Sequence, residues 1–155
     1  MSKGKSKTGM YAAIAIIVII IVVVGVVVAV MYKPAAKGTP LTLYAGEVSS
    51  AAYGFGNTAT TITSNPGPTI TLKQGTTYTM TVNNVGTMPH AWEISSQKAA
   101  GSVLFGAQID PTSYIAPGSS GSVTFSPNQA GNFYYVCIVP GHVALGMWGN
   151  VVVTP

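Results

Sequence analysis

The chain carries few charges, and most of its positive charge lies near the N-terminus. Only 6% of the 155 residues are charged, arginine is absent, and five of the seven lysines lie at or before Lys37. The two remaining lysines and the three acidic residues give residues 38–155 a formal net charge of −1. Since this part has no basic patch, we do not expect it to bind nucleic acid.

Cysteine and histidine are also scarce. Cys137 is the only cysteine, whereas domains outside the cytoplasm normally use cysteines in pairs as disulfides. An unpaired cysteine in such a domain suggests a free thiol with a chemical role. His90 and His142 are the only histidines of the chain.

One long apolar run precedes the rest of the chain. Twenty residues from Ala12 to Met31 carry no charge, and as a helix they span about 30 Å, the thickness of a bilayer core. Tyr11 and Tyr32 bracket the run, as interfacial aromatic residues do. We therefore expect a transmembrane helix over residues 11–32. The alternative is a cleaved signal peptide, whose apolar core is shorter, about 7–15 residues.

The lysines around this run predict its orientation. Three lysines lie in residues 1–10 and two follow the run, so the positive-inside rule favours a cytoplasmic N-terminus. Residues 33–40, KPAAKGTP, are expected to form a linker, and residues 41–155 a domain. The sequence thus predicts a single-pass protein of the cell membrane with its domain outside the cytoplasm.

Short segments rich in Thr, Val, Ile, Tyr and Phe follow the linker, and turn sequences such as NPGP and APGSSG separate them. This pattern predicts an all-β sandwich or barrel. Residues 51–64 are ambiguous between a strand and a glycine-rich loop. The expected strands are residues 41–48, 68–75, 76–84, 90–95, 103–109, 121–126, 131–139 and 149–155.

Three residues with sulfur or imidazole donors lie close together near the C-terminus. The run YYVCIVPGHVALGMWGNVVV contains Cys137, His142 and Met147, each separated by four residues, and His90 lies upstream. Taken singly, such residues are usually part of a core. Together, a thiolate, two imidazoles and a thioether make a ligand set that suits copper cycling between two oxidation states. If the four converge, the chain is an electron carrier.

The segment AGNFYYVCIVPGHVALGMWGNVVV resembles the ligand loop of type 1 (blue) copper proteins, the cupredoxins. Its CxxxxHxxxxM spacing and GMWG ending most resemble the sulfocyanin and rusticyanin branch. The resemblance implies a Greek-key β-sandwich with one type 1 mononuclear copper site, Cu(II)/Cu(I). His90, Cys137 and His142 would be equatorial ligands and Met147 a long axial one. Many cupredoxins carry Asn or Ser after the first histidine, whereas this chain has Ala91.

The resemblance also implies a function. We expect a membrane-anchored carrier, not an enzyme, that passes single electrons between respiratory-chain components on the outer face of the membrane. Its expected partners are a terminal oxidase, a cytochrome complex or an iron-oxidation chain. His142 should be the least buried ligand, and an apolar ring around it should dock these partners. The expected ring residues are Met88, Pro89, Pro140, Val143, Ala144 and Leu145.

Two other functions remain open. One is a copper chaperone or storage domain, which binds Cu(I) without cycling. The other is a thiol hydrolase with Cys137 as nucleophile and His142 as base. The three acids, at positions 47, 93 and 110, offer this hydrolase no obvious residue to orient the base. A copper oxidase or nitrite reductase would need a second metal centre or an open coordination site. Because one site already uses both histidines, we do not expect such an enzyme.

Overall fold

The computed structural model describes residue 11 and residues 38–155. Nearly all of the expected transmembrane helix, 11–32, and most of the expected linker therefore lie outside the described residues. Within the described part, no helix has both the length and the apolar character that crossing a membrane requires. Residues Lys37–Pro155 group into one compact unit.

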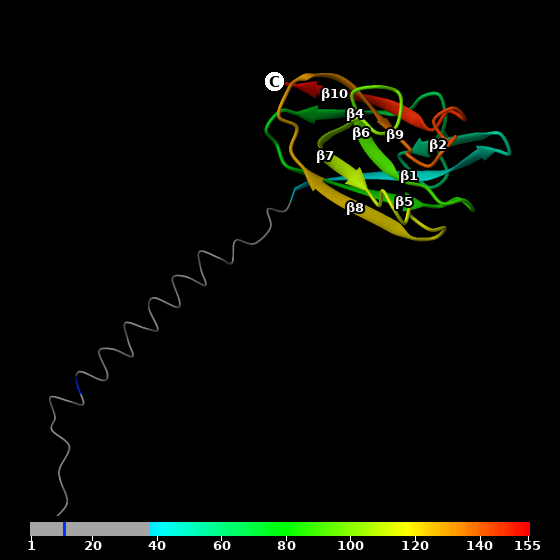
Figure 1. Cartoon of the computed structure of the whole chain (residues 1–155), viewed down its shortest axis with the longest axis horizontal. Helices are drawn as coiled ribbons and strands as arrows, with labels where there is room; N and C mark the ends of the chain where they lie inside the picture. The colour runs from blue at the N-terminus through cyan, green and yellow to red at the C-terminus, as the bar shows by residue number, and fades with distance from the viewer. Residues whose placement is uncertain (1–10, 12–37) are drawn as a thin grey trace, which may run out of the picture. The chain divides into compact units, whose positions relative to one another are not determined.

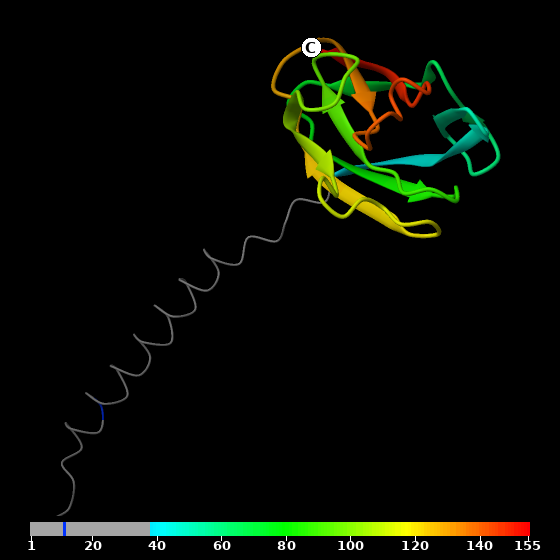
Figure 2. The same cartoon turned by 45° about the vertical axis from the view of Figure 1, so that its right-hand side comes forward.

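Ten strands form two five-stranded sheets that pack against each other (Figures 1 and 2). The first sheet has the order β3-β2-β1-β5-β8, and the second has the order β4-β10-β9-β6-β7. The strands of the first sheet are β1 (Thr39–Ser49), β2 (Ala52–Gly56), β3 (Ile62–Thr63), β5 (Tyr78–Asn84) and β8 (Ser120–Phe125). Those of the second are β4 (Gly67–Lys73), β6 (Trp92–Ser95), β7 (Val103–Ile109), β9 (Gly131–Val136) and β10 (Trp148–Thr154). The expected all-β, two-sheet architecture is confirmed.

Alternating side chains explain why these segments form strands with one face in the core. In β5, Tyr78, Met80 and Val82 are buried, while the residues between them are half-buried. β10 alternates in the same way, with Val151 and Val153 pointing inward. This period of two places the apolar side chains of each strand on one face of its sheet. Both sheets contribute to a single buried cluster that includes the fully buried Trp92.

Most predicted strand boundaries are off by one to three residues, and two of these errors fall at the expected ligands. The segment 131–139 ends as a strand at Val136, so Cys137 lies in the following loop. The segment 90–95 begins as a strand only at Trp92. His90 forms an isolated bridge with Ile115 instead, exchanging backbone hydrogen bonds of 3.1 and 2.6 Å. The ligand positions leave the sheet because their backbone turns toward the end of the sandwich.

Two further segments differ from the expectation. Residues 51–64, which the sequence left ambiguous between a strand and a loop, contain strands and a loop. β2 and β3 pair in antiparallel fashion, and a loop connects them. Thr39 and Pro40 belong to β1, so the expected linker overlaps the first strand by two residues. They extend the parallel pairing of β1 with β5, where Thr39 lies opposite Tyr78.

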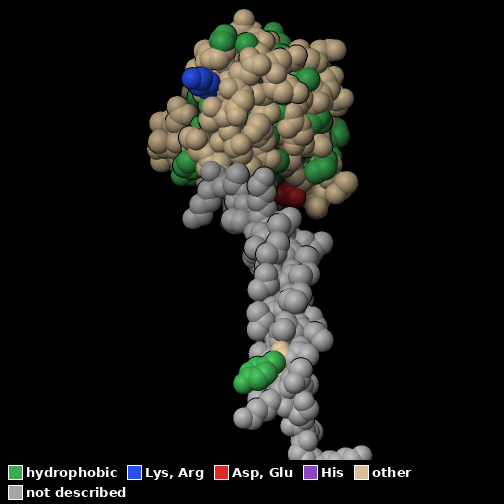
Figure 3. Space-filling view, turned by 90° about the vertical axis from the view of Figure 1, so that its left-hand side faces the viewer, with side chains coloured by type: hydrophobic (Ala, Val, Ile, Leu, Met, Phe, Trp, Pro, Cys, Tyr) green, Lys and Arg blue, Asp and Glu red, His purple; other side chains and the backbone are tan. Residues whose placement is uncertain are grey.

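The surface reflects the low charge of the sequence. The face shown in Figure 3 presents mostly backbone and side chains that are neither hydrophobic nor charged, with scattered hydrophobic side chains and single charged groups. Among the described residues, the large hydrophobic side chains with the most exposure outside the N-terminal segment include Val48 (46%), Val85 (45%) and Met88 (44%).

Candidate metal centre

Cys137 directly follows β9, at the end of the sandwich where β10 begins. Its backbone N–H donates to the carbonyl of Met147 at 3.1 Å, one step beyond the pairing of Val136 with Trp148. This bond closes the intervening residues into a loop that returns to its starting point. The loop therefore brings its first and last donor side chains to the same edge of the sheet.

Turns within this loop bring His142 back toward the cysteine. The N–H of His142 donates to the carbonyl of Val139, and the His142 carbonyl accepts from Met147 at 3.0 Å. Gly141 and Gly146 adopt φ values of 86° and 92°, a left-handed conformation that favours glycine. Tight turns therefore connect the donors, and a glycine precedes His142 and Met147 at the points where the backbone reverses.

His90 reaches the same point from the segment before β6, the strand next to β9, and a buried asparagine fixes its approach. The Asn84 side chain donates to the carbonyls of Met88 and Ile115, both at 2.8 Å, and its Oδ1 accepts from the N–H of Gly86 at 3.0 Å. The Ile115 carbonyl also accepts from the N–H of His90. Asn84 therefore ties the segment before His90 to the segment that pairs with it.

Glu47 of β1 supports the same segment. Its carboxylate accepts from the N–H groups of Thr87 (3.0 Å) and Met88 (2.9 Å) and from the Thr87 hydroxyl. Partial burial alone would raise the pKa of Glu47, but these hydrogen bonds outweigh it and hold the pKa below the ordinary value of 4.5. A Cβ added at Gly86 would collide with the Glu47 carboxylate. The backbone therefore approaches this carboxylate closely, and a side chain at position 86 would displace it.

The side chains of His90, Cys137 and His142 converge. Their donor atoms all lie within 4.8 Å of one another. The two Nδ1 atoms are 3.3 Å apart, and the Cys137 Sγ lies 3.6 Å from the His142 Nδ1. Metal bonds of about 2.0 Å to nitrogen and 2.3 Å to sulfur, in a trigonal arrangement, require separations of about 3.5 and 3.7 Å. These two separations are thus close to the spacing that one metal ion needs.

The converging side chains are shielded from water. His90 and Cys137 are fully buried, as is the neighbouring Met147, while His142 is 5% exposed. His142 is thus the least buried of the four, as expected from its place in the loop. Within the described residues the Nε2 of His90 is buried without a hydrogen-bond partner, so packing fixes the orientation of its ring.

Burial shifts the proton affinities of the three donors. It lowers the pKa of His90 to about 4, an effect that His142 strengthens and Glu47 opposes. Burial likewise lowers the pKa of His142. It raises the pKa of Cys137 to about 11, although hydrogen bonds from the amides of Ala91 and Val139 work against the increase. At neutral pH both imidazoles are therefore neutral and available to a metal, while the thiol has to lose a proton.

The amide of Ala91 supplies a hydrogen bond where many cupredoxins have a polar side chain. Its N–H donates to the Cys137 sulfur at 3.4 Å, because β6 begins directly beside the end of β9. The absence of a side-chain donor at this position therefore leaves the sulfur with a backbone partner. Hydrogen bonds to a ligating sulfur help to set the reduction potential of a copper site.

Sequence reasoning missed Tyr53, which lies in the stretch that remained ambiguous. Its ring centroid is 4.4 Å from that of His142 and 5.9 Å from that of His90. Its N–H donates to the carbonyl of Leu145 at 3.0 Å, and the N–H of Asn65 similarly binds the carbonyl of Gly146. Residues from 51–65 thus hold the loop from outside, and Tyr53 covers the imidazoles. The alternation in AYGFG at 52–56 was the signal for a strand there.

Comparisons with known proteins point to one family. The model of the family described as copper binding proteins, plastocyanin/azurin family, matches residues 58–154. The chain is 32% identical over 93 residues to the copper-resistant cuproprotein CopI of Rubrivivax gelatinosus, covering 55% of this chain and 56% of that protein. It spans about half the length, or less, of the curated relatives it matches.

Solved structures share the fold. The copper nitrite reductase of Nitrosomonas europaea matches with a TM-score of 0.59 and 26% identity, over 77% of this chain and 42% of that chain. The auracyanin of Roseiflexus castenholzii matches with a TM-score of 0.54 and 22% identity, over 77% of this chain and all of that one. The family match, taken with the donor cluster described above, shows that the cofactor of this domain is one copper ion in a type 1 site.

Proposed function

The chain belongs to the plastocyanin/azurin family of copper-binding proteins, and we propose that it is a single-copper electron carrier in which His90, Cys137 and His142 hold the ion. One observation carries this proposal. Three donors of the right chemistry converge within 4.8 Å in a buried pocket at the end of a sandwich. Met147, fully buried and hydrogen-bonded through its backbone to Cys137 and His142, is proposed as the fourth, axial ligand.

The protein contributes a fixed donor geometry to this function. When bound, copper accepts and releases one electron, and the transfer is fast when its ligands hardly move between the two states. His90 is held by its bridge to Ile115, and the loop from Cys137 to Met147 is closed by its own backbone hydrogen bonds. Burial keeps water away from the donors. We propose that this rigidity is the main contribution of the chain to electron transfer.

The donor inventory supports a carrier over a copper enzyme. His90 and His142 are the only histidines of the chain, and both point into this one site. A second histidine-based metal centre therefore has no ligands in this chain. A thiol hydrolase is also disfavoured, because burial raises the pKa of Cys137 to about 11 instead of activating the thiol.

The setting we propose for this carrier is the outer face of the cell membrane. The apolar run from Ala12 to Met31 supports a single membrane anchor with the N-terminus in the cytoplasm. The CxxxxHxxxxM spacing and the GMWG ending support the sulfocyanin and rusticyanin branch. In that setting the partners would be components of a respiratory chain, such as a terminal oxidase, a cytochrome complex or an iron-oxidation chain.

A copper chaperone or storage role is the second candidate. The observation that favours it is the likeness to a protein named as a copper-resistant cuproprotein, at 32% identity. Such a role requires release of Cu(I) to an acceptor and no reversible redox cycle. The two functions therefore differ in a property that can be measured directly.

The test is to add Cu(II) to the full chain and record its visible spectrum through a redox cycle. A carrier shows an intense blue charge-transfer band that a reductant bleaches and an oxidant restores. Cys137→Ser should abolish the colour, while Met147→Leu should keep it and shift the reduction potential. A protein that takes up copper but does not regain the band on reoxidation would support storage, and a colourless protein would refute the type 1 assignment.

A further inference from the structure

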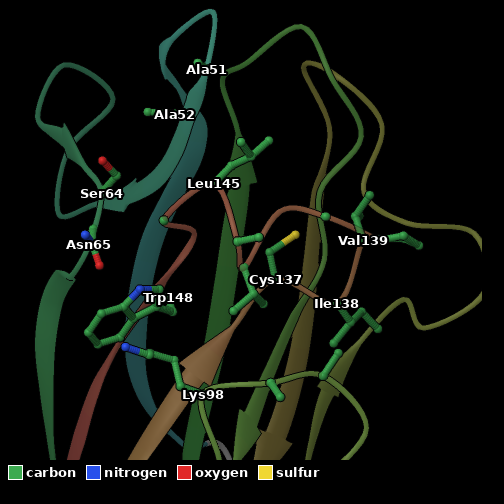
Figure 4. A pocket seen from close by; sticks show the side chains of 17 residues that line it. Ala51, Ala52, Ser64, Asn65, Lys98, Cys137, Ile138, Val139, Leu145 and Trp148 are labelled. Atoms are coloured by element: carbon green, nitrogen blue, oxygen red, sulfur yellow. The ribbon is translucent and has the colours of Figure 1, made fainter.

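A hollow of about 820 Å³ lies beside the copper-ligand loop, and the site itself accounts for only part of it (Figure 4). Most of residues 137–148 form one wall, including Cys137. The stretches 51–52 and 64–65 form a second wall, and residues 98–100 form a third. Its volume is within the range of small-molecule and peptide-binding clefts. His142 and Met88 do not line it, so it is distinct from the His142 edge.

The third wall of the hollow is held in place by two buried polar side chains. Glu93 is fully buried, and its carboxylate accepts from the N–H of Gly101 and from the side-chain amide of Gln108, both at 2.8 Å. Ser95, also fully buried, donates from its hydroxyl to the carbonyl of Ala99 at 2.9 Å. These bonds span the exposed turn between β6 and β7. The buried side chains of Glu93 and Ser95 therefore hold this turn in place as one wall of the hollow.

This wall carries one positive charge. The Lys98 Nζ lies 4.1 Å from the centroid of the Trp148 ring, where a cation is attracted to the face of the indole. Lys98 is the only charged residue among those that line the hollow. In Figure 4 the end of the Lys98 side chain lies beside the indole of Trp148. Trp148 is half-buried and lines the hollow.

The charge matters because the described domain has so little of it. Among residues 38–155 the only other cation is Lys73. Lys73 pairs with Thr154 at the far end of the sheet, whereas Trp148 pairs with Val136 next to the ligand loop. One of two cations is thus placed at the end of the molecule where the copper ligands lie. An anion that approaches the hollow meets Lys98 and no acidic lining residue, while the buried Glu93 carboxylate lies beneath the same turn and Glu47 lies at the His90 segment.

We propose that this hollow docks an acidic segment of the redox partner, with Lys98 and the Trp148 indole as its anchor. The proposal rests on the proposed electron-carrier function. A carboxylate of the partner pairs with Lys98, while apolar groups beside it contact Leu145, which is 37% exposed, and the neighbouring Val143 and Ala144. Cys137 is fully buried but is among the lining residues, so a partner docked here would approach the copper site from a side separate from the His142 edge.

This changes the expected docking surface. The apolar ring predicted around His142 divides into two parts in the structure. Pro140, Val143, Ala144 and Leu145 face the hollow, whereas Met88 and Pro89 do not line it. The positive charge of Lys98, which would attract an acidic partner, therefore lies beside the part of the ring that faces the hollow.

The test compares Lys98→Glu with Lys73→Glu, which make the same charge change at opposite ends of the domain. The full chain, reduced and copper-loaded, is oxidised by the anion hexacyanoferrate(III), which takes one electron and becomes hexacyanoferrate(II). Tris(phenanthroline)cobalt(III) serves as the cationic oxidant. At low ionic strength Lys98→Glu should slow the anionic reaction about fivefold or more and accelerate the cationic one. Lys73→Glu should change either rate less than twofold.

A second measurement addresses the acidic segment directly. Poly-L-glutamate should inhibit oxidation of the unaltered chain by hexacyanoferrate(III), and the inhibition should be lost in Lys98→Glu but kept in Lys73→Glu. Equal effects of the two variants, or no inhibition by poly-L-glutamate, would overturn the docking site. A blue band and a reversible potential in the same samples show that the electron-carrier function holds independently. If the unaltered, copper-loaded chain does not cycle reversibly between Cu(II) and Cu(I), the proposed electron-carrier function is itself refuted.

Discussion

Replacing Asn84 with alanine should destabilise the domain and loosen His90. The side chain is 2% exposed and makes three hydrogen bonds, to the carbonyls of Met88 and Ile115 and from the N–H of Gly86. Alanine removes all three at once. The segment that leads into His90 then loses its side-chain link to Ile115 and keeps only the backbone bridge between His90 and Ile115.

The size of the effect follows from the groups left without partners. A buried polar group that loses its hydrogen bond costs about 1–3 kcal/mol. The Ile115 carbonyl keeps its bond from the N–H of His90, and the bond to the Met88 carbonyl is only partly buried. Each of the three groups should therefore cost about 1 kcal/mol, so the free energy of unfolding should fall by about 3 kcal/mol in total. If the free energy of unfolding falls by about 1.5 kcal/mol per molar urea, the midpoint of urea unfolding should fall by about 2 M.

Urea unfolding of the copper-free chain, followed by tryptophan fluorescence, measures this change. Asn83→Ala is the matched control, because Asn83 is the preceding residue of β5, half-buried and on the opposite face of the strand. It should cost less than about 1 kcal/mol. The copper-loaded Asn84→Ala protein should also lose its metal to a chelator faster than the control. If the two variants unfold at the same urea concentration, Asn84 does not hold the His90 segment as described.

Other expected outcomes concern protons and packing. Copper binding at pH 7 should release about one proton, because burial raises the pKa of Cys137 to about 11; calorimetry in two buffers measures it, and no release would contradict it. Burial lowers the pKa of His90 from 6.5 to about 4, so its neutral form stabilises the copper-free fold above pH 6.5. As the pH falls from 6.5 through 4, about 3 kcal/mol of this stability should be lost, and a flat thermal midpoint would count against it. Gly149→Ala should destabilise by about 1–3 kcal/mol, because its Cβ would collide with the Tyr135 ring, and an unchanged melting temperature would exclude that clash.

The sequence was sufficient for the class of fold and for the donors that converge. The alternation in TTYTMTV is enough to indicate which side chains of β5 point inward, because a period of two depends only on local geometry. Cys137, His142 and His90 were recognisable because such donors are rare in this chain. The membrane anchor, the respiratory partners and the branch of the family remain predictions.

What the sequence did not reveal depends on contacts between distant residues. Glu47 and Thr87 are 40 positions apart, and nothing near either one indicates that they meet. The roles of Asn84 and Tyr53 likewise arise only when strands from different parts of the chain pair. Strand ends were misplaced at Cys137 and His90 because their local composition favours strands, while the tertiary fold turns both out of the sheet.

X-ray absorption at the copper edge, on the oxidised and the reduced full chain, tests the central claim most directly. That claim is that His90, Cys137 and His142 hold one copper in a geometry fixed by the fold. The account predicts one short sulfur ligand and two nitrogen ligands in both oxidation states, with nearly unchanged distances. Loss of the sulfur or of one imidazole on reduction would contradict it.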